Sequence, residues 1–149
     1  FSRYSPWFPI GRIVSFGCVT PLSAAETNAY AAPFPSRKHQ TAARAYPSLV
    51  PISPHDPERA ANTQAWSVLR QWPKPFITLF STRDPVTRGG DRMFQEAVPG
   101  AQGQAHTRVR TAGHFLQEDK GPELAQLLCQ FMASNPIGAE GQPQPSQAP

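Results

Sequence analysis

The chain has 149 residues, 39% of them hydrophobic, with 18 prolines, 10 glycines and a formal net charge of +4. This length suffices for one ordinary domain, but the proline and glycine content indicates that much of the chain forms turns, loops or tails. No apolar run approaches the roughly 18 residues that a membrane span needs, so we expect no membrane partner. The arginines are spread along the chain rather than gathered in a patch, which argues against a nucleic-acid binder.

The cysteines and histidines show no metal-ligand spacing, and Cys18 and Cys129 lie far apart. No phosphate-binding loop or dinucleotide-binding glycine fingerprint occurs either, so neither a metal nor a cofactor is predicted. Nothing in the cysteine usage requires an oxidising compartment, and a cytoplasmic protein is expected. The chain starts at Phe1 without a targeting segment, which we interpret as an N-terminally truncated or fragmentary product.

The first half of the chain is predicted to be mainly helical. Ser23, with Glu26 three residues later, forms a capping-box pattern that begins a helix running to about Tyr30. Proline density and the helical spacing of apolar residues delimit the other elements: an irregular segment over 1–20, a helix at 37–46, a loop at 51–57 and a helix at 57–71. The apolar residues of this last helix share one face, which we expect to be buried.

The second half alternates strands with helices. The nearly continuous apolar run 76–80 suits a strand covered on both faces, as in a parallel sheet, and a second strand is predicted near 106–110. Helices at about 89–97 and 121–133 follow these strands, which indicates an α/β layout with right-handed crossovers. Because two strands do not make a stable doubly wound sheet, we expect an incomplete domain.

Asp84 and His114 are the residues whose positions indicate chemistry. Each follows a predicted strand, and functional groups gather at the carboxyl ends of strands in an open α/β sheet. On neighbouring strands, the carboxylate would fix the imidazole tautomer and leave the other nitrogen as a base. The order Asp then His matches α/β-hydrolases, in which the nucleophile precedes both. Taken singly, each residue also fits a simple turn or loop, so a structural role stays open.

The nucleophile that such a pair serves is not found. A nucleophile elbow needs glycines on either side of the reacting residue, and no Gly-x-Ser-x-Gly or Gly-x-Asp-x-x-Gly pattern occurs. The chain is therefore predicted to hold a base and its orienting acid without the group they serve. No catalytic role is predicted for the other histidines or for three acids that lack strand-end context: His39, His55, His106, Asp56, Asp91 and Asp119.

Three segments resemble the haloalkane dehalogenases of the α/β-hydrolase superfamily: AYAAPFP at 29–35, AYPSLVP at 45–51 and GHFLQED at 113–119. The resemblance covers roughly residues 1–134 and implies an incomplete domain, the C-terminal part of an α/β-hydrolase fold. Its expected divisions are part of the helical cap over 1–54, the last strands and helices of the core over 55–134, and a disordered tail over 135–149.

In that family an aspartate displaces halide from carbon, and a histidine-activated water hydrolyses the resulting ester. The resemblance implies that Asp84 is the triad acid and His114 the base, and that Phe34, Pro35 and Phe115 belong to the substrate and halide pocket. It also implies a small haloalkane substrate, no cofactor, and a missing N-terminal half of the fold. The protein is expected to be a monomer when complete.

The chain departs from the family pattern because the nucleophilic aspartate, the oxyanion-hole segment and the tryptophan beside the nucleophile are absent. We therefore expect the chain to be inactive alone. Two alternatives stay open. An epoxide hydrolase would use cap tyrosines, for which Tyr4, Tyr30 and Tyr46 are available. A non-catalytic fragment or interaction module would retain hydrolase-like segments without activity.

Overall fold

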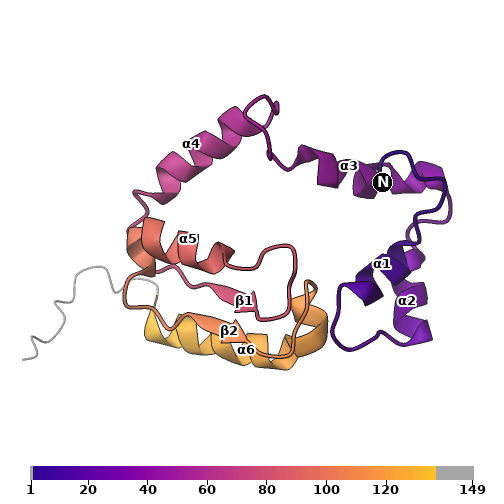
Figure 1. Ribbon diagram of the computed structural model, residues 1–149. Helices are drawn as coiled ribbons and strands as arrows, with labels where there is room; N and C mark the ends of the chain where they lie inside the picture. The colour runs from indigo at the N-terminus through magenta and orange to yellow at the C-terminus, as the bar shows by residue number, and fades with distance from the viewer. Residues whose placement is uncertain (1, 137–149) are drawn as a thin grey trace, which may run out of the picture.

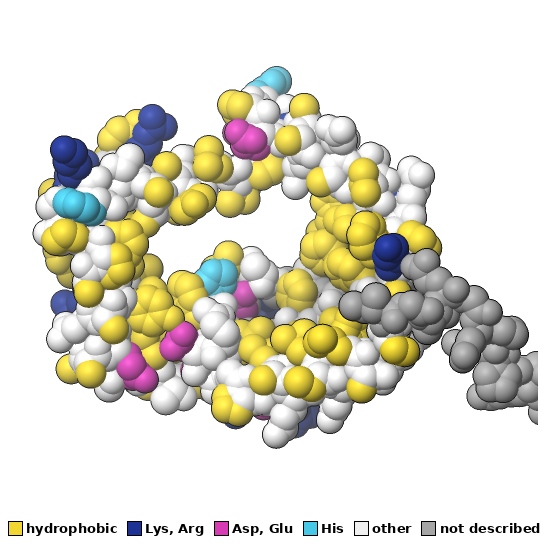
Figure 2. All heavy atoms as spheres, turned by 180° about the vertical axis from the view of Figure 1, so that it is seen from behind, with side chains coloured by type: hydrophobic (Ala, Val, Ile, Leu, Met, Phe, Trp, Pro, Cys, Tyr) yellow, Lys and Arg dark blue, Asp and Glu magenta, His cyan; other side chains and the backbone are white. Residues whose placement is uncertain are grey.

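The computed structural model describes residues 2–136, which form a ring around an open centre (Figure 1). A two-stranded sheet between two helices makes up one side of the ring, and short N-terminal helices make up the other. The space-filling view shows that side chains do not close the opening (Figure 2). The tail predicted as disordered over 135–149 lies almost entirely outside the described residues.

The N-terminal region is built from short helical elements: α1 (Ile10–Phe16), α2 (Ala24–Ala31), the 3₁₀ turn η1 (Arg37–Gln40), α3 (Thr41–Ala45) and the 3₁₀ turn η2 (Tyr46–Leu49). The expectation of an irregular segment over 1–20 is wrong where α1 forms. Pro9 precedes this helix and its carbonyl accepts the N–H of Ile13 at 2.9 Å, an arrangement in which proline is tolerated. Val14 is buried, so α1 contributes to the core.

The predicted capping box of α2 is confirmed. The Ser23 hydroxyl accepts the N–H of Glu26 at 3.2 Å, and the Glu26 carboxylate accepts the N–H of Ser23 at 2.7 Å. The next predicted helix, 37–46, begins instead as a 3₁₀ turn. Ser36 gives that turn no side-chain cap, because its hydroxyl bonds to Nδ1 of His39 at 2.9 Å.

Helix α4 (Arg59–Leu69) forms part of the rim of the ring and connects its two sides, close to the predicted range (Figure 1). The apolar face predicted for it is largely uncovered, since Val68 is 55% exposed and Trp72 is 39% exposed. Trp66 makes a packing contact, because its ring stacks on Phe94 with centroids 5.0 Å apart. Phe76 stacks on the same ring at 5.9 Å, so one aromatic cluster joins α4 to the sheet region.

The sheet consists of β1 (Leu79–Ser81) and β2 (Thr107–Val109), paired in parallel with Leu79 opposite Thr107. It lies between α5 (Gly90–Ala97) and α6 (Leu116–Ser134), while the 3₁₀ turn η3 (Pro99–Ala101) leads toward β2 (Figure 1). The predicted strand–helix–strand–helix order is confirmed. Helix α6 begins five residues before its predicted start and carries a kink at Lys120.

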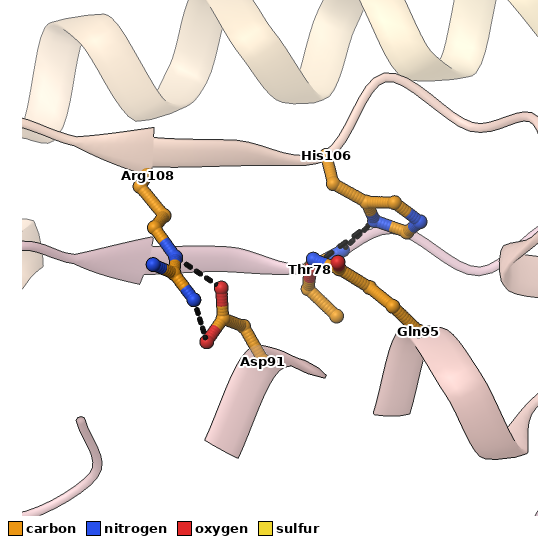
Figure 3. A network of polar contacts seen from close by, with 5 residues as sticks. All are labelled: Thr78, Asp91, Gln95, His106 and Arg108. Atoms are coloured by element: carbon orange, nitrogen blue, oxygen red, sulfur yellow. Dashed lines mark hydrogen bonds and ion pairs between the residues drawn. The ribbon is translucent and has the colours of Figure 1, made fainter. Parts of the chain in front are cut away.

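Both strands are shorter than predicted, and the side chain of His106 explains where they start. Nδ1 of His106 accepts the N–H of Thr78 at 3.0 Å, so this N–H leaves the strand ladder (Figure 3). The other ring nitrogen donates to the carbonyl of Ala101 at 2.8 Å, which fixes the neutral tautomer. His106 is thus structural, and it ties β1, η3 and the start of β2 together.

An ion pair between an exposed arginine and a buried carboxylate fastens α5 to β2. The guanidinium of Arg108 makes two contacts to the Asp91 carboxylate, at 2.5 and 3.0 Å, and the Asp91 side chain is only 3% exposed (Figure 3). The hydrogen bond to Arg108, opposed by burial, holds the pKa of Asp91 below its usual value. Gln95, one turn further along α5, donates to the Thr78 hydroxyl at 2.8 Å.

The apolar core within residues 2–136 is small. Its buried hydrophobic members are Val14, Val98, Ala101, Val109 and Ala112. In the same part of the chain no helix is long and apolar enough to cross a membrane.

Candidate active site

The parallel register brings the carboxyl ends of β1 and β2 to one edge of the sheet. Pairing continues past both strands, because the N–H of Thr82 bonds to the carbonyl of Val109 at 3.0 Å, and the N–H of Arg83 bonds to that of Ala112 at 3.1 Å. The next residues, Asp84 and His114, therefore emerge side by side although they lie 30 positions apart. The predicted convergence of this pair is confirmed.

The Asp84 carboxylate faces one nitrogen of the His114 ring. Nδ1 lies 3.1 Å from each carboxylate oxygen. The Asp84 side chain is buried at 6% exposure, whereas that of His114 is 37% exposed. The same carboxylate accepts the N–H of Val86 at 2.7 Å and the hydroxyl of Thr87. The bonds to Val86 and Thr87 shape the turn that begins at Asp84-Pro85. Asp84 therefore forms this turn and also holds the imidazole.

These contacts determine the charge on Asp84. Burial by itself raises the pKa of a carboxyl group, but the Thr87 hydroxyl, the Val86 N–H and His114 outweigh it and lower the pKa of Asp84 from 3.8 to about 2. Asp84 is therefore ionised at neutral pH and only accepts hydrogen bonds. Nδ1 of His114 must then carry the proton it shares with Asp84, which leaves Nε2 with a free lone pair.

Nε2 of His114 forms no hydrogen bond within residues 2–136. The ring borders a small hollow of about 150 Å³, lined by Asp84 and Thr87 on its polar side and by Leu79 and Leu116 on its apolar side. A half-exposed imidazole with one nitrogen fixed by a carboxylate and the other free is suited to take a proton from water or from an acid.

The three predicted pocket residues lie in different places. The ring of Phe115 packs edge-on against the His114 ring, with centroids 5.1 Å apart at 72°. Phe34 lines a separate cavity of about 210 Å³ in the N-terminal region, together with Phe8. Pro35 is exposed. Their substrate-pocket roles stay predictions.

The tyrosines of the epoxide-hydrolase alternative are also dispersed. Tyr4 and Tyr46 are 77% and 67% exposed. Tyr30 donates its hydroxyl to the Glu118 carboxylate, which raises the pKa of Tyr30 and links α2 to the start of α6. None of the three hydrogen-bonds to the His114 and Asp84 side chains in the described residues.

Sequence reasoning missed two residues that build this site. Thr87 donates to Asp84, and a hydroxyl three residues after an Asp-Pro turn is a local signal that could have identified it. Asp119 accepts the N–H of Gly113, next to His114. Because the predicted helix starts at residue 121, the sequence gives no sign that Asp119 belongs to the start of α6. Across residues 2–136, no group of three His, Cys, Asp or Glu side chains is placed to hold a metal ion.

Two parallel strands that end in an acid and a histidine, with a helix on each side, define the C-terminal part of an α/β-hydrolase fold. No family model matches the chain. It is 52% identical over 136 residues to a haloalkane dehalogenase of Psychrobacter cryohalolentis, covering 91% of this chain and 45% of that protein.

Two mycobacterial proteins give the same result. The haloalkane dehalogenase of Mycobacterium marinum is 51% identical over 128 residues, which are 86% of this chain and 43% of that protein. Haloalkane dehalogenase 1 of Mycobacterium tuberculosis H37Rv is 48% identical over 128 residues, with coverages of 86% and 42%. The chain thus resembles the C-terminal portion of a haloalkane dehalogenase, as predicted, and spans less than half the length of these curated relatives.

Proposed function

We propose that this chain supplies the base and its orienting acid to a haloalkane-dehalogenase-like hydrolase. The observation that carries the proposal is the pair formed by His114 and Asp84, in which a buried, ionised carboxylate holds Nδ1 and leaves Nε2 free. The relatives, named haloalkane dehalogenases, give the reaction class: replacement of a halogen on an alkyl carbon by a hydroxyl group.

The chemistry assigns one role to each residue. A carboxylate nucleophile, which residues 2–136 do not place beside His114, attacks the carbon, the carbon–halogen bond breaks, and halide leaves an alkyl ester on the protein. Nε2 of His114 then takes a proton from water as the water oxygen bonds to the ester carbonyl carbon. The ester C–O bond breaks, the alcohol departs with the returned proton, and Asp84 stabilises the imidazolium in between.

The shape of the described residues supports action together with the part of the relatives that this chain does not cover. The ring encloses an open centre (Figure 2), and large apolar side chains on α4 and α6 are uncovered, including Val68 at 55% and Met132 at 66% exposure. Apolar surface of this kind marks contact sites for further protein structure. We therefore expect activity only when the part of the fold that the relatives have and this chain does not span is also present. The expected substrate is a small haloalkane.

The test joins this chain to the N-terminal part of the Psychrobacter relative and follows halide release from a bromoalkane. His114→Ala should lower the steady-state rate by about 10²- to 10⁴-fold, the range for loss of a general base. Because the base acts only in the second step, the variant should still release about one halide per site in an initial burst.

His55→Ala is the matched control, since His55 is exposed and belongs to a loop. It should keep the rate of the unmodified protein. Steady turnover by His114→Ala at the control rate would refute the proposal. Epoxide opening without halide release by the unmodified protein would favour the epoxide-hydrolase alternative instead.

A further inference from the structure

The loop that carries His114 is fixed to the N-terminal region through Gly17, at the end of α1. The Gly17 carbonyl accepts the N–H of His114 at 2.7 Å and that of Phe115 at 3.2 Å. A Cβ on Gly113 would lie 2.4 Å from this oxygen, and a Cβ on Gly17 would lie 2.4 Å from the Phe115 ring. The two segments therefore approach too closely to admit a side chain at either glycine.

The Asp119 carboxylate binds both segments at once. Oδ1 accepts the N–H of Thr20 and Oδ2 accepts the N–H of Gly113, each at 2.8 Å. The N–H of Val19 lies 3.0 and 2.9 Å from the two oxygens. One side chain in the first turn of α6 thus joins the residues after α1 to the residue before His114, across 99 and 6 positions of sequence.

The electrostatics favour the ionised form of Asp119. Burial by itself raises the pKa, but the backbone N–H donors of Thr20, Val19 and Gly113 lower it by more, so the pKa of Asp119 lies below its usual value. At neutral pH the carboxylate therefore accepts on both oxygens: Thr20 donates to Oδ1, Gly113 donates to Oδ2, and the Val19 N–H is shared between them.

We propose that Asp119 is a positioning residue for His114, and that it clamps the loop of the base to the segment 17–20. Asp84 orients the imidazole ring, whereas Asp119 holds the backbone that presents the ring. The Phe115 ring connects the two contacts. It packs edge-on against the His114 ring, and it lies where a Cβ on Gly17 would be. This inference rests on the proposed function for the role of His114 as a base.

Asp119→Asn isolates the clamp. The asparagine amide has only one acceptor oxygen. In either orientation its NH₂ group therefore faces a backbone N–H, that of Gly113 or that of Thr20, and one hydrogen bond is lost. In the isotope-labelled 149-residue chain, hydrogen exchange at the Gly113 amide should accelerate about 10- to 100-fold, as expected for loss of a charge-assisted hydrogen bond. The nitrogen spectrum of the His114 imidazole should move from the Nδ1–H tautomer toward the average of the two tautomers.

The tautomer signal separates positioning from mere stabilisation. A residue that only stabilised the fold would leave the folded molecules with an intact Asp84–His114 pair and an unchanged imidazole spectrum. Neither readout depends on halide release, so failure of the proposed function would leave both expectations in place. Asp56→Asn is the matched control, because its carboxylate also accepts a backbone N–H, from Ser53 at 2.5 Å, in a different loop.

Thr20→Pro is the second variant, since it removes one of the three N–H donors to Asp119 at an exposed position and does not alter the Gly113 donor. It should change the Gly113 exchange and the His114 tautomer in the same direction by a smaller amount. An unchanged imidazole spectrum in a folded Asp119→Asn chain would overturn the proposal. Loss of all dispersed amide signals in both variants would also overturn it, because Asp119 would then be a folding determinant.

Discussion

Thr87→Val removes the hydroxyl that donates to the Asp84 carboxylate and nearly conserves the volume of the side chain. The pKa of Asp84, lowered from 3.8 to about 2, lies about 1.8 pH units below its ordinary value, which corresponds to about 2.5 kcal/mol in favour of the ionised form. A hydrogen bond to a charged group contributes roughly 1.5–3 kcal/mol, so loss of the Thr87 donor alone should raise the pKa by about 1 to 2 pH units.

The assay is carbon NMR of the aspartate carboxyl groups in the 149-residue chain as the pH is lowered from 7. At pH 3 the unmodified Asp84 should be about nine-tenths ionised, whereas Thr87→Val should leave it about half ionised or less. Thr63→Val is the control, since the Thr63 hydroxyl bonds only within α4, to the Arg59 carbonyl at 2.9 Å. An Asp84 carboxylate that stays ionised at pH 3 in Thr87→Val would show that the hydroxyl does not hold the charge.

The sign of the linked stability follows from the lowered pKa of Asp84. The folded state favours the ionised group, so its contribution of about 2.5 kcal/mol is fully present above the ordinary pKa of 3.8. It is lost as the pH falls through about 2 in the folded state. Thr87→Val should therefore flatten the acid side of the stability curve, and the difference from the unmodified chain should vanish at the acid end.

Two further substitutions test the scaffold in urea unfolding. Gly113→Ala should destabilise the chain by about 1–3 kcal/mol, because the new Cβ would meet the Gly17 carbonyl. The control Gly121→Ala should be neutral or slightly stabilising, because a Cβ there meets nothing within 4 Å. Equal effects of the two substitutions would refute the close approach of Gly113 to Gly17. His106→Leu should cost about 2 kcal/mol or more, because it leaves the buried Thr78 N–H without a partner and removes one of two donors to the Ala101 carbonyl. A loss no larger than that of His55→Leu would contradict this role.

Local patterns in the sequence were enough for the features that depend on neighbouring residues. The capping box of Ser23 and Glu26 is confirmed because both partners lie within one helical turn. The alternation of apolar runs with helical spacing predicted the parallel pair β1 and β2, and strand ends share one edge of such a sheet. The convergence of Asp84 and His114 followed from that rule.

Contacts across long stretches of sequence were decided by the tertiary structure alone. No local pattern predicts that Asp119 meets Thr20 across 99 positions, or that His106 draws the Thr78 N–H out of the ladder and shortens β1. The apolar spacing of α4 predicted a buried face, yet burial needs a covering surface, and residues 2–136 leave Val68 more than half exposed. The sequence by itself predicted that Asp84 and His114 converge at one edge of the sheet, because strand ends and residue order encode that placement. The folded chain decided what holds His114 in place, because backbone donors separated in sequence converge on one carboxylate only after packing.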